Sequence, residues 1–120
     1  MTPSEIITVD CQRNNVDPQK IINYVGWLLQ NKKAFLLHEF NSVLLAHILT
    51  KEDAELHLFT ADQPLSVMKA VNKFIQQIKG TKLKNVYGKS DDPQVLEMLK
   101  RADVKVEKSN HPEFAWMAKV

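Results

Sequence analysis

Apolar residues recur along this chain with two different spacings, and these spacings predict where helices and strands form. A helical spacing follows the polar-residue–proline pairs at residues 17–18, 63–64 and 92–93, so we expect helices to begin at Pro18, Pro64 and Pro93. The first helix should run to Asn31, and Gly80 should end the second. The buried face of the second helix is expected to hold Leu65, Met68, Val71, Phe74, Ile75 and Ile78.

Alternating or continuous short apolar runs mark the expected strands. Residues 5–11 (EIITVDC) alternate weakly and are expected to form a first strand. Three runs then follow in succession and predict an antiparallel meander: KAFLLHEF, SVLLAHIL and AELHLFT. Later strands are expected at KLKNVY, VKVE and EFAWMAKV. A helical crossover precedes KLKNVY, so this strand should lie parallel to the last strand of the meander.

The two loops of the meander set the expected pairing of its strands. With a two-residue turn at residues 41–42 and a four-residue second loop, Glu39, Glu55 and His57 share one face of the sheet. Both faces are mostly apolar, which indicates a sheet covered on both sides. We therefore expect one domain over residues 1–120, of the α/β class, with a mixed and mostly antiparallel sheet flanked by helices on both faces.

Composition narrows the class of protein without pointing to a function. The 44% hydrophobic and 25% charged content is typical of a globular chain. Neither a run of about 20 apolar residues nor a signal-peptide pattern is present, and Cys11 is the single cysteine, so we expect a cytoplasmic protein without a membrane partner or an internal disulfide. The net charge of +2 is small, although lysines concentrate in the second half. Scattered lysines are more typical of a solvated face than of a nucleic-acid site.

The common signatures of metal and nucleotide sites are missing from the sequence. His38, His47, His57 and His111 show no spacing typical of metal ligands, so no metal site is expected. Walker, Rossmann and deaminase motifs are also missing.

The order of the expected elements resembles that of the GNAT acyl-CoA N-acyltransferase family. Residues 86–106 (VYGKSDDPQVLEMLKRADVKV) look like the family's strand, Asn-x-x-Ala, helix and Gly-Phe pattern. Asp92 stands at the Asn position, Val95 at the Ala position, and Leu99 at the position of the tyrosine that often protonates the leaving thiolate. The spacing is also similar to that of short, degenerate GNAT-like proteins of bacteriophages, including internal virion proteins.

The resemblance implies acetyl-CoA as the cofactor, held where the last strand of the meander separates from the next strand. The pyrophosphate would then lie on the N-terminus of the following helix. The implied cofactor-binding residues are Leu58, Phe59, Thr60, Gln63, Leu65, Ser66 and Asp92. The turn at residues 60–66 departs from the family pattern because it lacks glycine, Pro64 removes one amide donor, and Asp62 adds negative charge.

The resemblance also implies candidates for catalysis. Acyl transfer to an amine needs a base and a donor that polarises the carbonyl. Glu55 and His57 are the candidate bases, with Glu39 on the same expected face, and amides near residues 58–60 are the candidate donors. Tyr87 is the nearest replacement acid. Each of the three also has an interpretation without a catalytic role. Glu55 would be a solvated carboxylate, His57 an ordinary histidine of the sheet, and Tyr87 an aromatic residue at a strand end.

Two hypotheses about function stay open, and a nucleic-acid-associated module is a weaker third. The first is an acetyl-CoA-dependent N-acetyltransferase acting on an amine of a protein or small molecule. The second is a catalytically inactive GNAT-like phage protein, located in the host cytoplasm or virion, that serves as a virion component or binds a host protein. The final strand, residues 113–120, is expected at a sheet edge, where it would offer a pairing surface to a second copy or another protein.

Overall fold

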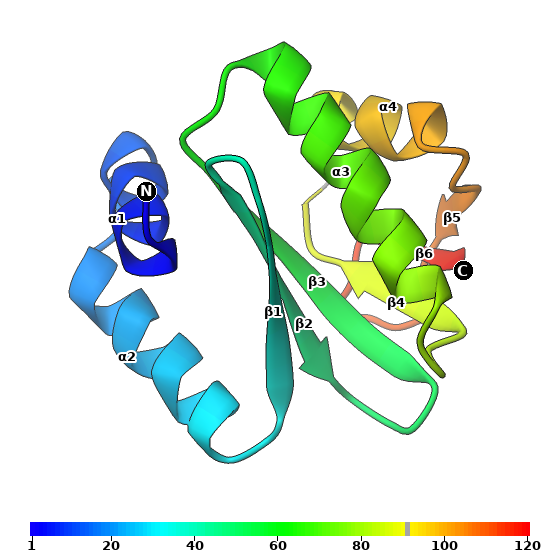
Figure 1. The fold of residues 1–120 in the computed structure, drawn as a ribbon. Helices are drawn as coiled ribbons and strands as arrows, with labels where there is room; N and C mark the ends of the chain where they lie inside the picture. Colours follow the sequence, from blue (N-terminus) through cyan, green and yellow to red (C-terminus); the bar gives the residue numbers. More distant parts are fainter. Residues whose placement is uncertain (91) are drawn as a thin grey trace.

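The computed structural model describes residues 1–90 and 92–120, which form helices on both sides of one six-stranded sheet (Figure 1). The helices are α1 (Pro3–Arg13), α2 (Pro18–Gln30), α3 (Pro64–Lys79) and α4 (Pro93–Arg101). The strands are β1 (Ala34–Glu39), β2 (Ser42–Ile48), β3 (Asp53–Thr60), β4 (Asn85–Gly88), β5 (Val106–Lys108) and β6 (Trp116–Lys119), in the sheet order β1-β2-β3-β4-β6-β5. Among the described strands, only β3 and β4 pair in parallel, which confirms the expected mixed, mostly antiparallel sheet.

The helices divide between the two faces of the sheet, as the apolar character of both faces predicted. Helices α1 and α2 cover one face, and α3 and α4 cover the other (Figure 1). The smaller core, under α1 and α2, holds Ile6, Ile7, Cys11, Val25, Leu28, Val43 and Leu45. The larger core, under α3 and α4, is centred on Phe74, Ile75, Ile78, Leu44, Ala46, Leu56, Val86 and Trp116. None of the described helices is long and apolar enough to span a membrane.

The segment expected to be the first strand is helix α1. Its start is fixed locally by a capping box, in which the Thr2 hydroxyl accepts from the Glu5 amide at 3.2 Å and a Glu5 carboxylate oxygen accepts from the Thr2 amide at 2.9 Å. Pro3 follows the cap at the first helical position. The β-branched residues of EIITVDC suggested a strand, but the cap and the burial of one helical face outweigh this weak preference.

The loop between β2 and β3 is one residue shorter than expected, and this difference reverses the faces of β3. The Leu49 amide donates to the Asp53 carbonyl at 2.9 Å, so only residues 50–52 lie between this closing pair, and His47 lies opposite Glu55. A shift of one residue turns every side chain to the other face. Glu55 and His57 therefore lie on the α1–α2 side of the sheet, beside His47.

Glu39 does not share that face, so the expected grouping of Glu39 with Glu55 and His57 is wrong. Its carboxylate accepts from the Gln77 side chain at 2.9 Å on the α3 side. The first hairpin turn is Phe40-Asn41, because Glu39 pairs with Ser42, and Phe40 takes a left-handed conformation with φ 54°. This two-residue shift in pairing leaves the faces of β1 unchanged.

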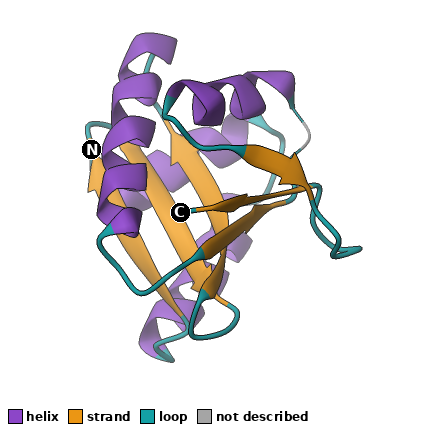
Figure 2. Cartoon of the chain, turned by 90° about the vertical axis from the view of Figure 1, so that its right-hand side faces the viewer, coloured by secondary structure: helices purple, strands orange, loops and turns teal. Residues whose placement is uncertain are grey.

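Two further expectations about surfaces are corrected. Strand β6 is not at an edge, because it pairs with β4 on one side and β5 on the other (Figure 2). The argument for dimerisation through this strand therefore has no basis in the fold, although dimerisation itself stays a prediction. Leu65 is 67% exposed, and the inner face of α3 instead uses Val67 and Ala70.

The end of β4 is closely packed against a tryptophan of the neighbouring strand. Gly88 pairs with Trp116, and a Cβ atom added at Gly88 would overlap the Trp116 indole. The indole is itself almost fully buried. Only a residue without a side chain fits beside it.

We therefore expect Gly88→Ala to lower the free energy of unfolding by about 1–3 kcal/mol, because the new methyl group overpacks a closed site. Gly26→Ala is the matched control, since nothing lies within 4 Å of its added Cβ in α2. That variant should gain up to about 1 kcal/mol from helix propensity. Urea unfolding of both variants measures the difference, and equal stability of Gly88→Ala and the parent protein would contradict this packing.

Candidate functional site

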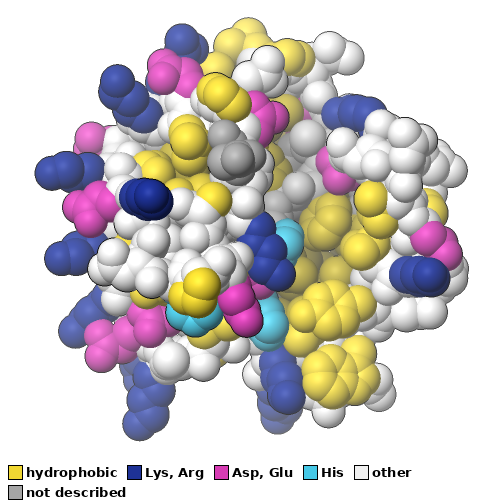
Figure 3. Space-filling model, turned by 180° about the vertical axis from the view of Figure 1, so that it is seen from behind, with side chains coloured by type: hydrophobic (Ala, Val, Ile, Leu, Met, Phe, Trp, Pro, Cys, Tyr) yellow, Lys and Arg dark blue, Asp and Glu magenta, His cyan; other side chains and the backbone are white. Residues whose placement is uncertain are grey.

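Strands β3 and β4 pair over a short distance and then separate. Their ladder joins residues 53–55 to residues 85–87, after which β3 continues to Thr60 while β4 ends at Gly88. A cavity of about 1400 Å³ opens at this separation, lined by parts of α1, β3, α3, β4 and α4. Seen from behind, the surface is hollowed there into a groove with an apolar wall, and His, Lys and acidic side chains gather at its margin (Figure 3).

A buried carboxylate, that of Glu55, lies where the two strands begin to separate. One of its oxygens, Oε1, is 3.6 Å from His47 Nδ1. The other, Oε2, is 3.2 Å from His57 Nε2 and 3.6 Å from Lys89 Nζ. Oε2 is buried without a well-directed hydrogen bond from any described residue. A carboxylate in this position is costly unless nearby cations or proton donors offset its desolvation, and these three side chains are the ones placed to do so.

The structure brings the three candidate catalytic residues together. Glu55 and Tyr87 are direct register partners on β3 and β4, and His57 contacts the Glu55 carboxylate. The His57 side chain is 40% exposed, which leaves it open to a ligand. The interpretation of Glu55 as a solvated carboxylate is wrong, because the residue is only 5% exposed. The centroid of the Tyr87 ring lies 5.2 Å from the centroid of the Phe114 ring.

The histidines around Glu55 are not arranged as metal ligands. Among residues 1–90 and 92–120, no three His, Cys, Asp or Glu side chains converge in a way that could hold a metal ion. Cys11 has no catalytic surroundings either, because it lies inside the smaller core, where burial raises the pKa of its thiol.

The backbone of β3 presents one of the expected amide donors to the opening. The Ala61 amide donates to the Asn41 carbonyl of the neighbouring hairpin, and the Thr60 amide donates to Asp10 Oδ1 at 3.2 Å. Backbone amides alternate in direction along a strand, so the Phe59 amide points toward β2 like that of Ala61. The Leu58 amide points the opposite way, toward the region beyond the end of the β3–β4 ladder. The Thr60 amide already donates to Asp10, and the Phe59 amide points away. The Leu58 amide is therefore the donor that faces the cavity.

Helix α3 begins at the cavity with free amide groups. Its N-cap residue, Gln63, makes no side-chain capping bond, and no acidic residue lies in its first turn. The helical ladder starts with the bond from the Val67 amide to the Gln63 carbonyl, so the Leu65 and Ser66 amides have no acceptor within the helix. Helix α4 differs, because Asp92 Oδ1 accepts from the Gln94 amide at 2.9 Å and so caps that helix.

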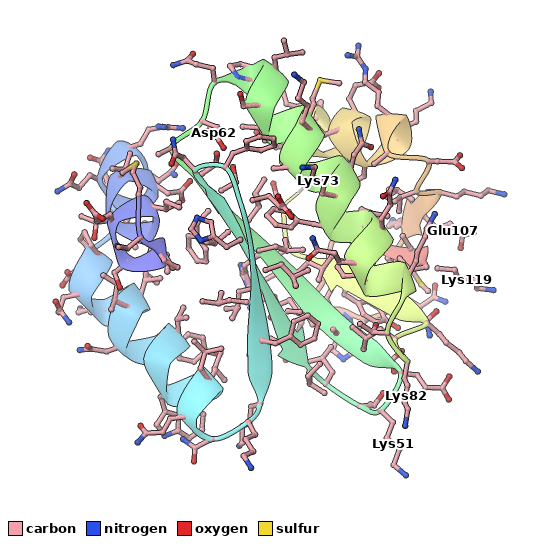
Figure 4. All side chains as sticks on the ribbon, viewed as in Figure 1. Lys51, Asp62, Lys73, Lys82, Glu107 and Lys119 are labelled. Atoms are coloured by element: carbon pink, nitrogen blue, oxygen red, sulfur yellow. The ribbon has the colours of Figure 1, made fainter. Side chains whose placement is uncertain are left out.

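The Asp62 carboxylate, which was expected to oppose an anion, is tied to the β1–β2 turn (Figure 4). Its Oδ2 atom accepts from the Asn41 amide at 3.0 Å and from the Ser42 hydroxyl at 2.7 Å. The Ser42 hydroxyl also lies 2.7 Å from the Thr60 hydroxyl. These bonds engage Oδ2 of the Asp62 carboxylate and fix the turn that leads into α3.

The implied cofactor residues divide into those that line the cavity and those that do not. Leu58, Thr60, Gln63 and Asp92 line it. Phe59 packs against the α1–α2 core, and the side chains of Leu65 and Ser66 lie outside the lining.

Sequence reasoning missed the cations of the cavity wall, which are Arg13, Lys89 and Arg101. It also missed His47, since a correct β2–β3 register was needed to place it beside Glu55. Lys89 directly follows β4, and this position is the one signal that could have pointed to it.

Comparison with known proteins places the fold but not the exact activity. The sequence matches no protein-family model, and no curated protein matches it. Among solved structures, the chain is similar to the Campylobacter jejuni N-acetyltransferase PseH in complex with acetyl coenzyme A. The TM-score is 0.62 at 12% identity, over 100% of this chain and 92% of that chain.

Two further acetyltransferases have similar structures. The Microcin C7 self immunity acetyltransferase MccE, in complex with acetyl-CoA and AMP, gives a TM-score of 0.56 at 17% identity, over 86% of this chain and 67% of that chain. The ribosomal-protein-S5-alanine acetyltransferase from Vibrio fischeri gives 0.52 at 13% identity, over 85% and 68%. These neighbours lend no support to a bacteriophage or virion origin. At such identities they show that the chain has the fold of GNAT N-acetyltransferases.

Asp10 on α1 gives this region a testable dependence on pH. Burial raises the pKa of the Asp10 carboxyl, while its bond from the Thr60 amide and the nearby Arg13 partly oppose the shift. A carboxyl whose pKa is raised by folding binds more protons in the folded state, so its contribution to stability falls as pH rises through that interval.

We therefore expect Asp10→Asn to gain stability relative to the parent protein as the pH rises above about 4, the ordinary range of aspartate. The asparagine oxygen still accepts from the Thr60 amide, so the substitution mainly removes the charge. Urea unfolding between pH 3 and 7 measures the difference, with the exposed Asp103→Asn as the control for removal of a charge. A difference that does not change with pH would contradict the assignment.

Proposed function

We propose that this chain transfers an acetyl group from acetyl-CoA to an amine. The observation that carries the proposal is the buried Glu55 carboxylate, with His57 beside it, at the point where β3 and β4 separate. The shared fold supports it, because PseH and MccE have this fold and their structures contain acetyl-CoA. That this chain binds acetyl-CoA in the cavity and that its acceptor is an amine both belong to the proposal.

The residues around the cavity fit such a cofactor. A volume of about 1400 Å³ is ample for a nucleotide and its pantetheine arm. The uncapped start of α3 offers the Leu65 and Ser66 amides to a pyrophosphate, and the positive end of the helix dipole favours an anion there. Arg13 adds positive charge to the wall, whereas the charge of Arg101 is paired with that of Glu97 at 3.3 Å. These groups take the place of the glycine-rich turn that the sequence lacks.

Glu55 and His57 would act on the acceptor. An alkylamine is protonated at neutral pH and must lose a proton before it can attack a carbonyl. Glu55 attracts the ammonium group, and either Glu55 or His57 can take its proton, since their side chains are 3.2 Å apart. Acetyl-CoA supplies the activated thioester, and the Leu58 amide faces the region where its carbonyl would be polarised.

The residue that protonates the leaving thiolate would be Tyr87 rather than Leu99. Leu99 lies in the larger core with only 6% of its surface exposed and carries no proton to donate. Tyr87 is half-buried on β4, beside Glu55 in the register. This assignment needs no tyrosine on α4.

A noncatalytic protein with this fold, which binds a partner protein, is the competing proposal. The glycine-free turn at residues 60–66 favours it, because Pro64 contributes no amide to an anion site. The two proposals differ in one measurable property, the binding of acetyl-CoA.

We expect calorimetric titration to show saturable binding of acetyl-CoA and of CoA to the full chain. Glu55→Gln should bind both with nearly unchanged affinity. With a panel of polyamines and lysine peptides as acceptors, the same variant should release CoA about a hundredfold more slowly, because a general base is lost. Release of the CoA thiol measures the rate.

Glu52→Gln is the matched control. Glu52 is an exposed carboxylate paired with Lys84 at 3.1 Å, so its removal should change neither binding nor rate. Circular dichroism would show whether Glu55→Gln still folds. Absence of binding at millimolar acetyl-CoA would refute the enzyme and favour the partner-binding proposal, which a pull-down would then pursue.

A further inference from the structure

The amine nearest to the candidate base belongs to the chain itself. Lys89 directly follows β4, lines the cavity, and places its Nζ atom 3.6 Å from Glu55 Oε2. Its side chain is 59% exposed, whereas that of Glu55 is 7% exposed. The amine therefore lies between solvent and a buried carboxylate, at the side of the cavity where β3 and β4 separate.

This pair differs from the other lysine–carboxylate pairs of the described chain. Lys84 and Glu52 are both exposed, and neither lines the cavity. Lys73 and Glu39 meet at 3.7 Å on the α3 side, also away from the cavity lining. Among these lysines, Lys89 alone lines the cavity, and its partner is a buried acid.

The groups that face the Glu55 carboxylate are His47, His57 and Lys89. His47 and His57 are fixed on the strands β2 and β3. Lys89 lies beyond the end of β4, on a flexible four-carbon chain, so its amine can move relative to the carboxylate. In an enzyme of the proposed kind, the position beside the base is the position of the acceptor amine.

We propose that Lys89 is an acceptor of this chain's own activity and is acetylated on Nζ within the cavity. The inference rests on the proposed function. Glu55, or His57 beside it, takes one proton from the Lys89 ammonium group. The neutral nitrogen then forms a bond to the acetyl carbon as the carbon–sulfur bond breaks. The products are Nζ-acetyl-Lys89, CoA with a free thiol and one proton.

The modification would change the charge at the site. Acetylation removes the positive charge of Lys89, so Glu55 loses the lysine cation beside it. The amine is also tethered beside the base, which gives it a large advantage over a lysine elsewhere on the surface.

The test is to incubate the full chain with isotopically labelled acetyl-CoA and to follow each lysine by peptide mass spectrometry. Lys89 should be acetylated about a hundredfold faster than Lys84, the lysine paired outside the cavity, and than Lys82, which points into solvent (Figure 4). The rate constant should not depend on protein concentration, because the reaction is within one molecule.

Three controls separate a templated reaction from ordinary surface chemistry. Glu55→Gln should lower the Lys89 rate to that of Lys84. An excess of CoA should suppress labelling of Lys89 but not of Lys82, and this control holds even if Glu55→Gln fails to fold. In the chain without acetyl-CoA, acetic anhydride should label Lys89 no faster than Lys84, because this reagent needs no cavity.

Calorimetric titration of the same preparation distinguishes the possible failures. If acetyl-CoA binds and Lys89 is no faster than Lys84, the inference is wrong and the proposed function stands. If Lys89 is fast but insensitive to both Glu55→Gln and CoA, the inference is also wrong. If acetyl-CoA does not bind, both proposals fail. Selective labelling that both controls abolish supports the inference.

Discussion

The short parallel ladder between β3 and β4 is the constraint on which the rest of this structure depends. Three residue pairs join the strands, and Glu55 stands at the last of them. Strand β3 continues for five more residues without a partner on that side, since β4 ends at Gly88 against the Trp116 indole. The cavity, the lack of a β4 partner for the Leu58 amide and the position of Lys89 all follow from this early end of pairing. A longer β4 would close the cavity and cover the amide.

Two carboxylates near the cavity accept hydrogen bonds from backbone amides and a hydroxyl. The same side chains that carry negative charge there also hold the cavity wall in place. Asp62 accepts from the Asn41 amide and the Ser42 hydroxyl, and Asp10 accepts from the Thr60 amide. Together they tie the turn before α3 to the first hairpin and to α1. The same carboxylates line the cavity near the proposed anion site, and their hydrogen bonds hold them in place. The chain therefore fixes this turn with acidic side chains rather than with glycines.

The sequence predicted features that depend on residues close together in the chain, such as helix starts. It did not predict the register of β3, which depends on the length of one loop. A polar residue before proline located three helix starts correctly, because the fixed φ of proline acts within one turn, aided by an aspartate cap at α2 and α4. The fourth helix, α1, has its own capping box at Thr2, but its β-branched residues suggested a strand. Residues 50–53 (TKED), which follow β2, are all polar. Their sequence therefore does not show whether Asp53 belongs to the loop or to β3. That one residue decides which side of the sheet Glu55 faces and whether it meets His47.

The burial of Glu55 bears on the choice between an enzyme and a protein that keeps only the fold. Structural similarity at 11–17% identity shows that this fold tolerates almost complete change of sequence. An apolar residue of similar size at position 55 would avoid the desolvation of a carboxylate, and such replacements of buried ionic groups are often neutral or stabilising. A chain that needed only a stable scaffold would therefore gain little from Glu55, from the histidines around it, or from a lysine held at its side. Their convergence beside the cavity favours the proposed proton transfer from an amine over a purely structural role.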